Sequence, residues 1–143
     1  MPTSYAVTRT INAAPERVWR LLTDGEAYPR WNPSVVSLRG RIVSGEKIEL
    51  VSTVNTKRRF VLSVSHVEPE RRMVWSSGMP LGLFRGVRTF VLESRSSSQT
   101  EFSMREEYSG LLAGLITRTI PDLNDAFGQF ADGLKAAAES NDR

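Results

Sequence analysis

The chain has 143 residues, of which 40% are hydrophobic, and it contains no cysteine. This length suits one compact domain, so we expect residues 1–143 to form a single domain. The absence of cysteine excludes disulfide bonds and thiolate metal sites. The net charge is only +3, and the arginine pairs at 58–59 and 71–72 are separated by an apolar segment. They do not form the continuous basic stripe that nucleic-acid binding needs, so we expect no nucleic-acid partner.

The first ten residues lack the apolar stretch of a secretory leader, and the apolar run near Leu111 is too short to cross a bilayer. We therefore expect a cytoplasmic protein without stable membrane insertion, either a monomer or a homodimer. His66 is the only histidine, and no cluster of metal-ligating side chains accompanies it. Neither a phosphate-binding glycine loop nor a dinucleotide motif occurs, so we predict no metal and no cofactor.

The N-terminal third of the chain predicts one strand and two short helices. Residues 4–11 alternate with a period of two and are rich in β-branched side chains, which predicts a strand. Pro15 and Glu16 are typical of a helix start, and this helix is expected to end at Asp24 and Gly25. Residues 28–33 hold two aromatic residues between two prolines, which indicates a second short helix or turn.

Residues 35–108 have almost entirely β signals. Turn-like sequences separate six expected strands, at residues 35–42, 47–54, 59–67, 72–77, 84–93 and 100–108. Short connections predict an antiparallel meander. If the last hairpin turns at Ser97, Leu92 faces Phe102 and Phe90 faces Met104. The same register places Arg88 opposite Glu106 and Gly86 opposite Tyr108.

The pattern of this hairpin places two charged residues on its apolar face. Arg88 and Glu106 follow the apolar pairs on one face, while the other face carries the charged residues expected of a solvent face. Those residues are Arg95, Glu93, Glu101, Arg105 and Glu107. We therefore predict that Arg88 and Glu106 point inward together.

The C-terminal segment has a clear helical period. Its apolar residues recur at steps of three or four, at Leu112, Ile116, Ile120, Leu123, Phe127, Phe130, Leu134 and Ala137. Pro121 interrupts this stripe, because proline lacks an amide donor and disfavours a helical residue before it. We predict a short helical turn over 111–119 and a main helix over 121–139, with Pro121 at the first position and Thr119 or Ile120 near the cap.

The sizes of these elements predict an α+β fold. A nineteen-residue helix is about 28 Å long and about 10 Å wide, whereas seven adjacent strands span roughly 33 Å. The sheet must therefore curve around the C-terminal helix, and the two short helices between the first and second strands close part of the opening. This arrangement predicts a cavity between sheet and helix.

Four segments resemble the START-like, or SRPBCC, helix-grip superfamily. They are Ile11-Asn12-Ala13-Ala14-Pro15-Glu16-Arg17-Val18-Trp19, Leu22-Thr23-Asp24 with Tyr28-Pro29-Arg30-Trp31-Asn32-Pro33, Val67-Glu68-Pro69 before Val74-Trp75, and Tyr108-Ser109-Gly110-Leu111-Leu112. The superfamily includes polyketide cyclase and dehydrase-like proteins, a carbon monoxide dehydrogenase-related group and plant pathogenesis-related allergens. The resemblance implies a seven-stranded antiparallel sheet that grips the last helix around an apolar pocket for lipids, polyketides or other hydrophobic molecules. It implies no single activity.

The expected pocket combines apolar walls with one polar group. We predict ligand contacts from Phe60, Leu62, Trp75, Phe84, Arg88, Phe90, Met104, Glu106, Tyr108, Leu123, Phe127 and Phe130. Arg88 and Glu106 need a partner or water in apolar surroundings, so they either orient a polar ligand head with Tyr108 or form a self-satisfied ion pair. His66 is expected on the inward face at the end of its strand, as a structural or rim residue. Trp19 and Trp31 are expected to pack in the core.

The segment 78–86 contains three glycines and several apolar residues. We interpret it as a gate over the pocket, with a permanent cap or a partner-binding patch as alternatives. For the whole protein we expect carriage or sensing of a small hydrophobic molecule. The alternatives are a cyclase or dehydratase that uses Arg88, Glu106 and Tyr108, and a protein-binding regulator similar to the chaperone activators.

Overall fold

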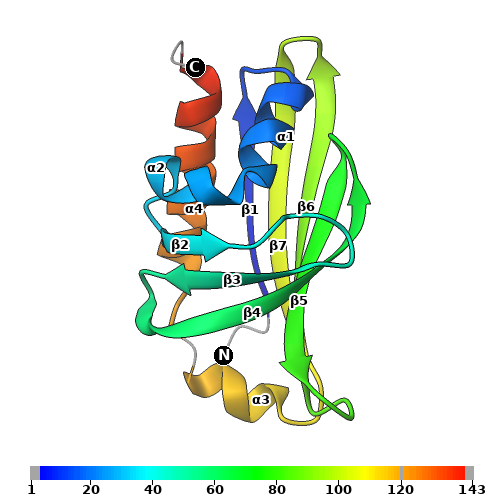
Figure 1. The fold of residues 1–143 in the computed structure, drawn as a ribbon, viewed down its shortest axis with the longest axis vertical. Helices are drawn as coiled ribbons and strands as arrows, with labels where there is room; N and C mark the ends of the chain where they lie inside the picture. The colour runs from blue at the N-terminus through cyan, green and yellow to red at the C-terminus, as the bar shows by residue number, and fades with distance from the viewer. Residues whose placement is uncertain (1–3, 120, 141–143) are drawn as a thin grey trace.

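The computed structural model describes residues 4–119 and 121–140, in which seven strands and a long C-terminal helix, α4, form the framework (Figure 1). In chain order the elements are β1 Ser4–Ile11, α1 Pro15–Thr23, the 3-10 helix η1 Gly25–Ala27, α2 Tyr28–Trp31, β2 Val35–Arg39, β3 Lys47–Ser52, β4 Asn55–Glu68, β5 Arg72–Met79, β6 Phe84–Ser96, β7 Gln99–Ser109, α3 Ala113–Ile116, η2 Thr117–Thr119 and α4 Asn124–Glu139. The predicted α+β class and the order of elements are confirmed.

The strands form one antiparallel sheet in the order β1-β7-β6-β5-β4-β3-β2. The predicted meander is confirmed for β2 to β7. In addition, β1 joins the far edge of β7, where Ser4 lies opposite Glu107 and Ile11 lies opposite Thr100. The predicted register of the last hairpin is also confirmed, with Arg88 opposite Glu106.

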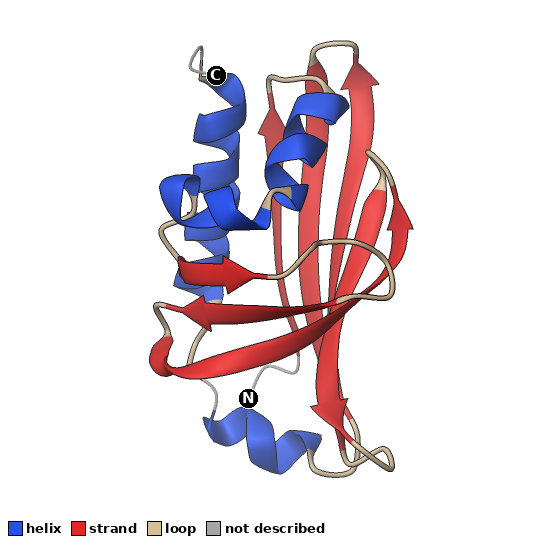
Figure 2. Cartoon of the chain, in the orientation of Figure 1, coloured by secondary structure: helices blue, strands red, loops and turns tan. Residues whose placement is uncertain are grey.

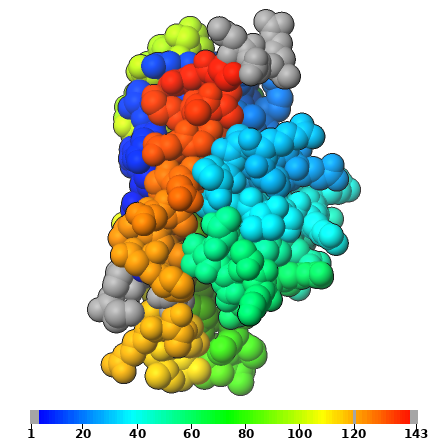
Figure 3. Space-filling model, turned by 90° about the vertical axis from the view of Figure 1, so that its left-hand side faces the viewer, coloured from blue at the N-terminus to red at the C-terminus, as the bar shows by residue number. Residues whose placement is uncertain are grey.

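The sheet curves strongly, so that β2 and β3 run across the direction of β6 and β7 (Figure 2). Helix α4 fills the hollow and lies between β1 on one side and the α2–β2 segment on the other (Figure 3). One face of α4 remains at the surface, as its polar stripe predicts. None of the described helices is long and apolar enough to span a bilayer.

The buried face of α4 follows the predicted helical stripe with one change. Phe127, Phe130 and Leu134 are buried as expected. Toward the C-terminal end the buried residue is Ala138, whereas Ala137 is only half-buried. The reason is that an α-helix has about 3.6 residues per turn, so the residue that follows Leu134 on the buried face is Ala138, four positions later. Ile120, which belonged to the predicted stripe, lies outside the described residues.

Helix α4 begins three residues later than predicted. It starts at Asn124 with Leu123 at the N-cap, so Pro121 is not its first residue. The carboxylate Oδ1 of Asp122 accepts a hydrogen bond from the amide of Asn124 at 2.9 Å, which satisfies a donor that the helix start leaves free. The side chain of Asp122 therefore sets the helix start, in preference to the proline.

The C-terminal end of α4 is held by the first helix. The Arg17 guanidinium donates hydrogen bonds to the carbonyl oxygens of Ala138 at 2.6 Å and Ser140 at 2.8 Å. These carbonyls lie in or beyond the last helical turn, where the helix itself supplies no donor. The bonds therefore fix α4 against the N-terminal part of the chain.

Two departures from the predicted strands affect the site. Between Ser65 and Glu68 the β4 register shifts, and His66 takes a positive φ of 51° and is exposed. The bulge breaks the alternation that predicted an inward His66. Segment 78–86 is also mostly strand, since Met79 pairs with Phe84 and only residues 80–83 form the turn.

Candidate functional site

A cavity of about 260 Å³ lies between the concave face of the sheet and α4. Its walls include every predicted contact residue except Phe90, namely Phe60, Leu62, Trp75, Phe84, Arg88, Met104, Glu106, Tyr108, Leu123, Phe127 and Phe130. Phe90 is fully buried behind the wall, with its ring centroid 4.6 Å from that of Trp75 and 5.9 Å from that of Phe130. Phe90 therefore does not line the cavity, contrary to expectation, because the larger indole of Trp75 covers it.

The cavity also has lining residues that the sequence did not indicate. They are Ser34, Val35, Leu50, Ser52, Val54, Asn55, Arg58, Ser77, Gly86, Ile116, Thr119, Pro121 and Ala126. Arg58 could have been found, because it precedes Phe60 by two positions and so shares its face of β4. The same reasoning would have found Ser77 and Gly86, which lie two positions from Trp75 and Arg88, and Ile116 belongs to the predicted helical stripe.

The predicted polar group is formed by Arg88 on β6 and Glu106 on β7. The Arg88 Nε donates to Glu106 Oε1 at 2.7 Å, and both side chains are 16% exposed. The Tyr108 hydroxyl donates to the other carboxylate oxygen, Glu106 Oε2. Strand pairing explains the arrangement, since residues 106 and 108 share a face of β7 and residue 88 is directly opposite. We call these three residues the inner polar group.

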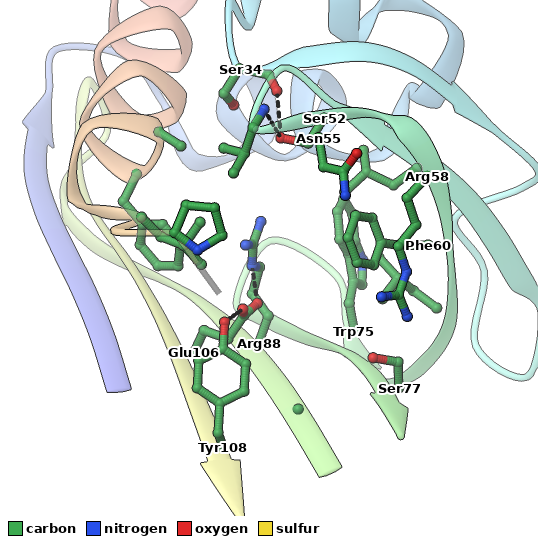
Figure 4. A pocket seen from close by; sticks show the side chains of 18 of the residues that line it. Ser34, Ser52, Asn55, Arg58, Phe60, Trp75, Ser77, Arg88, Glu106 and Tyr108 are labelled. Atoms are coloured by element: carbon green, nitrogen blue, oxygen red, sulfur yellow. Dashed lines mark hydrogen bonds and ion pairs between the residues drawn. The ribbon is translucent and has the colours of Figure 1, made fainter. Parts of the chain in front are cut away.

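The inner polar group is neutral overall, because the charges of Arg88 and Glu106 offset each other. The Arg88 guanidinium also lies 4.8 Å from the ring centroid of Phe127, on α4. Its terminal nitrogens point into the open centre of the cavity (Figure 4). The group therefore presents N–H donors to a ligand without presenting a net charge.

Burial changes the acid-base behaviour of two tyrosines near this group. Desolvation raises the pKa of Tyr108 far above its usual value, and the nearby Glu106 carboxylate raises it further. Burial likewise raises the pKa of Tyr28, whose hydroxyl donates to the Leu22 carbonyl oxygen at 2.6 Å. Both phenols therefore remain protonated donors at neutral pH.

These pKa shifts predict alkaline destabilisation. The native protein holds the Tyr28 and Tyr108 protons to a higher pH than the unfolded chain does. Their contribution to stability is therefore present below the ordinary tyrosine pKa of about 10 and is lost as the pH rises above it. We expect urea midpoints to fall above about pH 10 and to fall less steeply in Tyr108→Phe. Equal slopes in the two proteins would contradict this assignment.

The remaining sequence candidates lie outside the cavity. His66 is exposed and its Nδ1 is 3.0 Å from the Ser65 hydroxyl, so it contributes nothing to the cavity wall. Trp19 and Trp31 pack against the core, as expected. Residues 4–119 and 121–140 contain no cluster of three or more side chains suited to hold a metal ion.

The hairpin turn at residues 80–83 lies against the segment that precedes α3. The amide of Leu111 donates to the Gly82 carbonyl oxygen at 3.1 Å, and the amide of Leu112 donates to that of Leu83 at 2.7 Å. Leu81 and Leu111 are 92% and 85% exposed. The backbone bonds join the turn to its neighbour, which favours the interpretation of a cap over that of a gate.

Comparison with known families gives one match along almost the entire chain. The profile described as "Polyketide cyclase / dehydrase and lipid transport" matches residues 2–139. A search of curated proteins found no match.

Solved structures share the fold at low sequence identity. A START superfamily protein from Mycobacterium smegmatis has a TM-score of 0.69 and 15% identity, covering 95% of this chain and 97% of that one. Protein MLL2253 from Mesorhizobium loti has a TM-score of 0.71 and 20% identity, covering 98% and 99%. The di-domain ARO/CYC BexL from the BE-7585A biosynthetic pathway has a TM-score of 0.69 and 17% identity, and the match covers 94% of this chain and 45% of BexL.

Proposed function

Because the chain belongs to the polyketide cyclase/dehydrase and lipid transport family, we propose that it binds and carries a small hydrophobic molecule in the cavity between the sheet and α4. The observation that carries this proposal is the composition of the cavity wall. Aromatic and aliphatic side chains form most of it, and the inner polar group provides one charge-neutral set of hydrogen-bonding atoms. An apolar wall with a few oriented polar groups is the usual form of a small-molecule site.

The state of the inner polar group supports carriage over cyclase or dehydratase chemistry. A general acid or base works best when its pKa lies near the working pH. The pKa of Tyr108 is raised away from that range, and both carboxylate oxygens of Glu106 already accept hydrogen bonds from Arg88 and Tyr108. The group is therefore better suited to orient a neutral ligand oxygen than to move a proton.

The proposal is tested with a ligand pair that differs only in charge. Dodecanoate and dodecanol would be compared by fluorescence displacement on the wild type, Glu106→Gln and Arg88→Met. Glu106→Gln removes the charge that offsets Arg88, so we expect the acid to bind about tenfold more tightly while the alcohol changes little. Arg88→Met leaves the Glu106 carboxylate without its cation, so the acid should bind more weakly than to the wild type.

Two outcomes would argue against the proposal. If neither compound displaces the probe from the wild type, the cavity is not a site for such molecules. If all three proteins rank the two compounds identically, the inner polar group does not contact the ligand and Arg88 with Glu106 is only a structural ion pair. Native mass spectrometry of freshly purified protein provides an independent check, because a carrier is expected to retain a hydrophobic molecule.

A further inference from the structure

The cavity has a second polar region, formed by Asn55 and Arg58 where β4 begins. Figure 4 shows both side chains across the open centre of the cavity from Glu106 and Tyr108. Asn55 and Arg58 are exposed, whereas the side chains of Arg88 and Glu106 are only 16% exposed. Among the lining residues, Asn55 and Arg58 are exposed, as are Thr119 and Pro121, so solvent reaches the cavity rim at Asn55 and Arg58. We call these two residues the mouth pair.

Arg58 forms no ion pair with the described residues, whereas the next residue, Arg59, does. Its guanidinium carbon lies 4.8 Å from the ring centroid of Phe60, and no carboxylate among the described residues forms an ion pair with it. Arg59, on the opposite face of β4, lies 3.6 Å from a carboxylate oxygen of Glu49. The positive charge of Arg58 thus lies against the Phe60 ring in the cavity wall, with no ion-paired carboxylate among the described residues to offset it.

Asn55 adds a second unused donor on the same side of the cavity. Its side-chain oxygen accepts a hydrogen bond from the Lys57 amide at 3.2 Å, which orients the carboxamide. No hydrogen bond from its side-chain nitrogen to the described residues is present. The mouth pair therefore offers N–H donors and one positive charge, which suits an anionic oxygen group such as a carboxylate.

Solvation favours the same orientation of a ligand. A carboxylate buried beside the neutral inner polar group would lose most of its water without meeting an uncompensated cation. At the mouth pair it keeps part of its hydration and meets Arg58. A neutral hydroxyl or carbonyl oxygen can be buried beside Arg88 and Tyr108 at much lower cost.

We infer that the mouth pair holds the anionic end of the ligand, and that the ligand class is an amphipathic carboxylic acid with a neutral oxygen near its far end. This inference rests on the proposed function, because it names the ligand of the same cavity. It assigns the two ends of the ligand to two different sets of residues. The carboxylate contacts Arg58 and Asn55, and the neutral oxygen contacts the inner polar group.

The experiment uses dodecanol, dodecanoate and ω-hydroxydodecanoate with the variants Arg58→Gln and Arg59→Gln. Arg59→Gln is the matched control, because it removes the same charge one residue away, on the other face of the strand. We expect Arg58→Gln to weaken dodecanoate binding about threefold to fivefold, as for a partly exposed ion pair, and to leave dodecanol unchanged. Arg59→Gln should leave both affinities unchanged.

ω-Hydroxydodecanoate tests whether the neutral end of the ligand contacts the inner polar group. Wild type should bind ω-hydroxydodecanoate more tightly than dodecanoate, and the ratio of these two affinities should persist in Arg58→Gln, because the hydroxyl is read at the inner polar group. Thermal unfolding of each variant verifies that the fold is intact; both substitutions are at exposed positions, so the midpoints should match that of the wild type.

The possible failures are distinguishable. If no compound binds to the wild type, the proposed function fails together with this inference. If dodecanol binds but Arg58→Gln and Arg59→Gln weaken dodecanoate equally, only the general charge of the protein acts, and the inference is wrong while the proposed function stands. Equal losses of acid and alcohol in Arg58→Gln would show that Arg58 only packs against the ligand, which also overturns the inference.

Discussion

Replacing Phe130 by alanine is expected to lower the free energy of unfolding by about 3 to 5 kcal/mol. The side chain is 2% exposed, on the α4 face that the sheet encloses. Its ring centroid lies 5.6–6.3 Å from the centroids of four aromatic rings, those of Tyr28, Trp31, Phe90 and Phe102. These rings come from α2, β6 and β7, so one truncation removes contacts that join three parts of the fold.

Phe127→Ala is the comparison for this prediction. Both side chains line the cavity, but Phe127 packs against one aromatic ring, that of Tyr5, and against the Arg88 guanidinium. Truncation there removes fewer aromatic contacts, so the loss should be smaller than for Phe130→Ala. Urea unfolding of the two variants measures both values. A larger loss for Phe127→Ala would contradict the assignment of the aromatic cluster around Phe130 as the main anchor of α4.

Gly133→Ala should destabilise the protein by about 1 to 3 kcal/mol, although alanine is the better helix former. A Cβ atom at Gly133 would overlap the carbonyl oxygen of Trp31 and lie 3.1 Å from Cδ of Pro33. The backbone of α4 therefore meets the backbone at the end of α2 directly. An added methyl group must push the two segments apart, which also disturbs the Trp31 contact with Phe130.

Gly128→Ala is the matched control, because it lies on the same helix. A Cβ atom there would meet no other atom within 4 Å. The substitution should therefore stabilise the protein by up to about 1 kcal/mol through helix propensity alone. Thermal and urea unfolding of both variants distinguish the cases. Stabilisation by Gly133→Ala similar to that of Gly128→Ala would contradict the close approach of α2 and α4.

The proposed position of the ligand carboxylate at Arg58 predicts how the binding of an acid depends on salt concentration. In the proposed orientation, the anionic end of the ligand remains near solvent at Arg58, and its neutral end lies near Arg88 in the inner polar group. Association of an acid should therefore depend on salt concentration, because the rim charge is screened by ions. The contacts of the apolar body with Phe60 and Trp75 should depend on salt much less.

The sequence determined those features that depend on neighbours along the chain. The Arg88–Glu106 pair could be predicted because a short turn after Ser96 sets the register of the hairpin, and register sets which side chains face each other. The positions of Phe127 and Phe130 could be predicted because helical periodicity places them on one face. Part of the cavity wall could be identified for a similar reason, through strand alternation.

Only the tertiary structure decided the features that depend on segments far apart. Phe90 has the same alternation as Arg88, yet it is hidden because the Trp75 ring lies over it. No sequence pattern indicates that Gly133 contacts Trp31. This contact exists because α2 and α4 pack against each other in the folded chain. The mouth pair is likewise a tertiary feature. The strand pattern places Arg58 beside Phe60, but only the curvature of the sheet brings the start of β4 across the cavity from the inner polar group. Periodicity specifies the face of an element, and long-range packing specifies what that face meets.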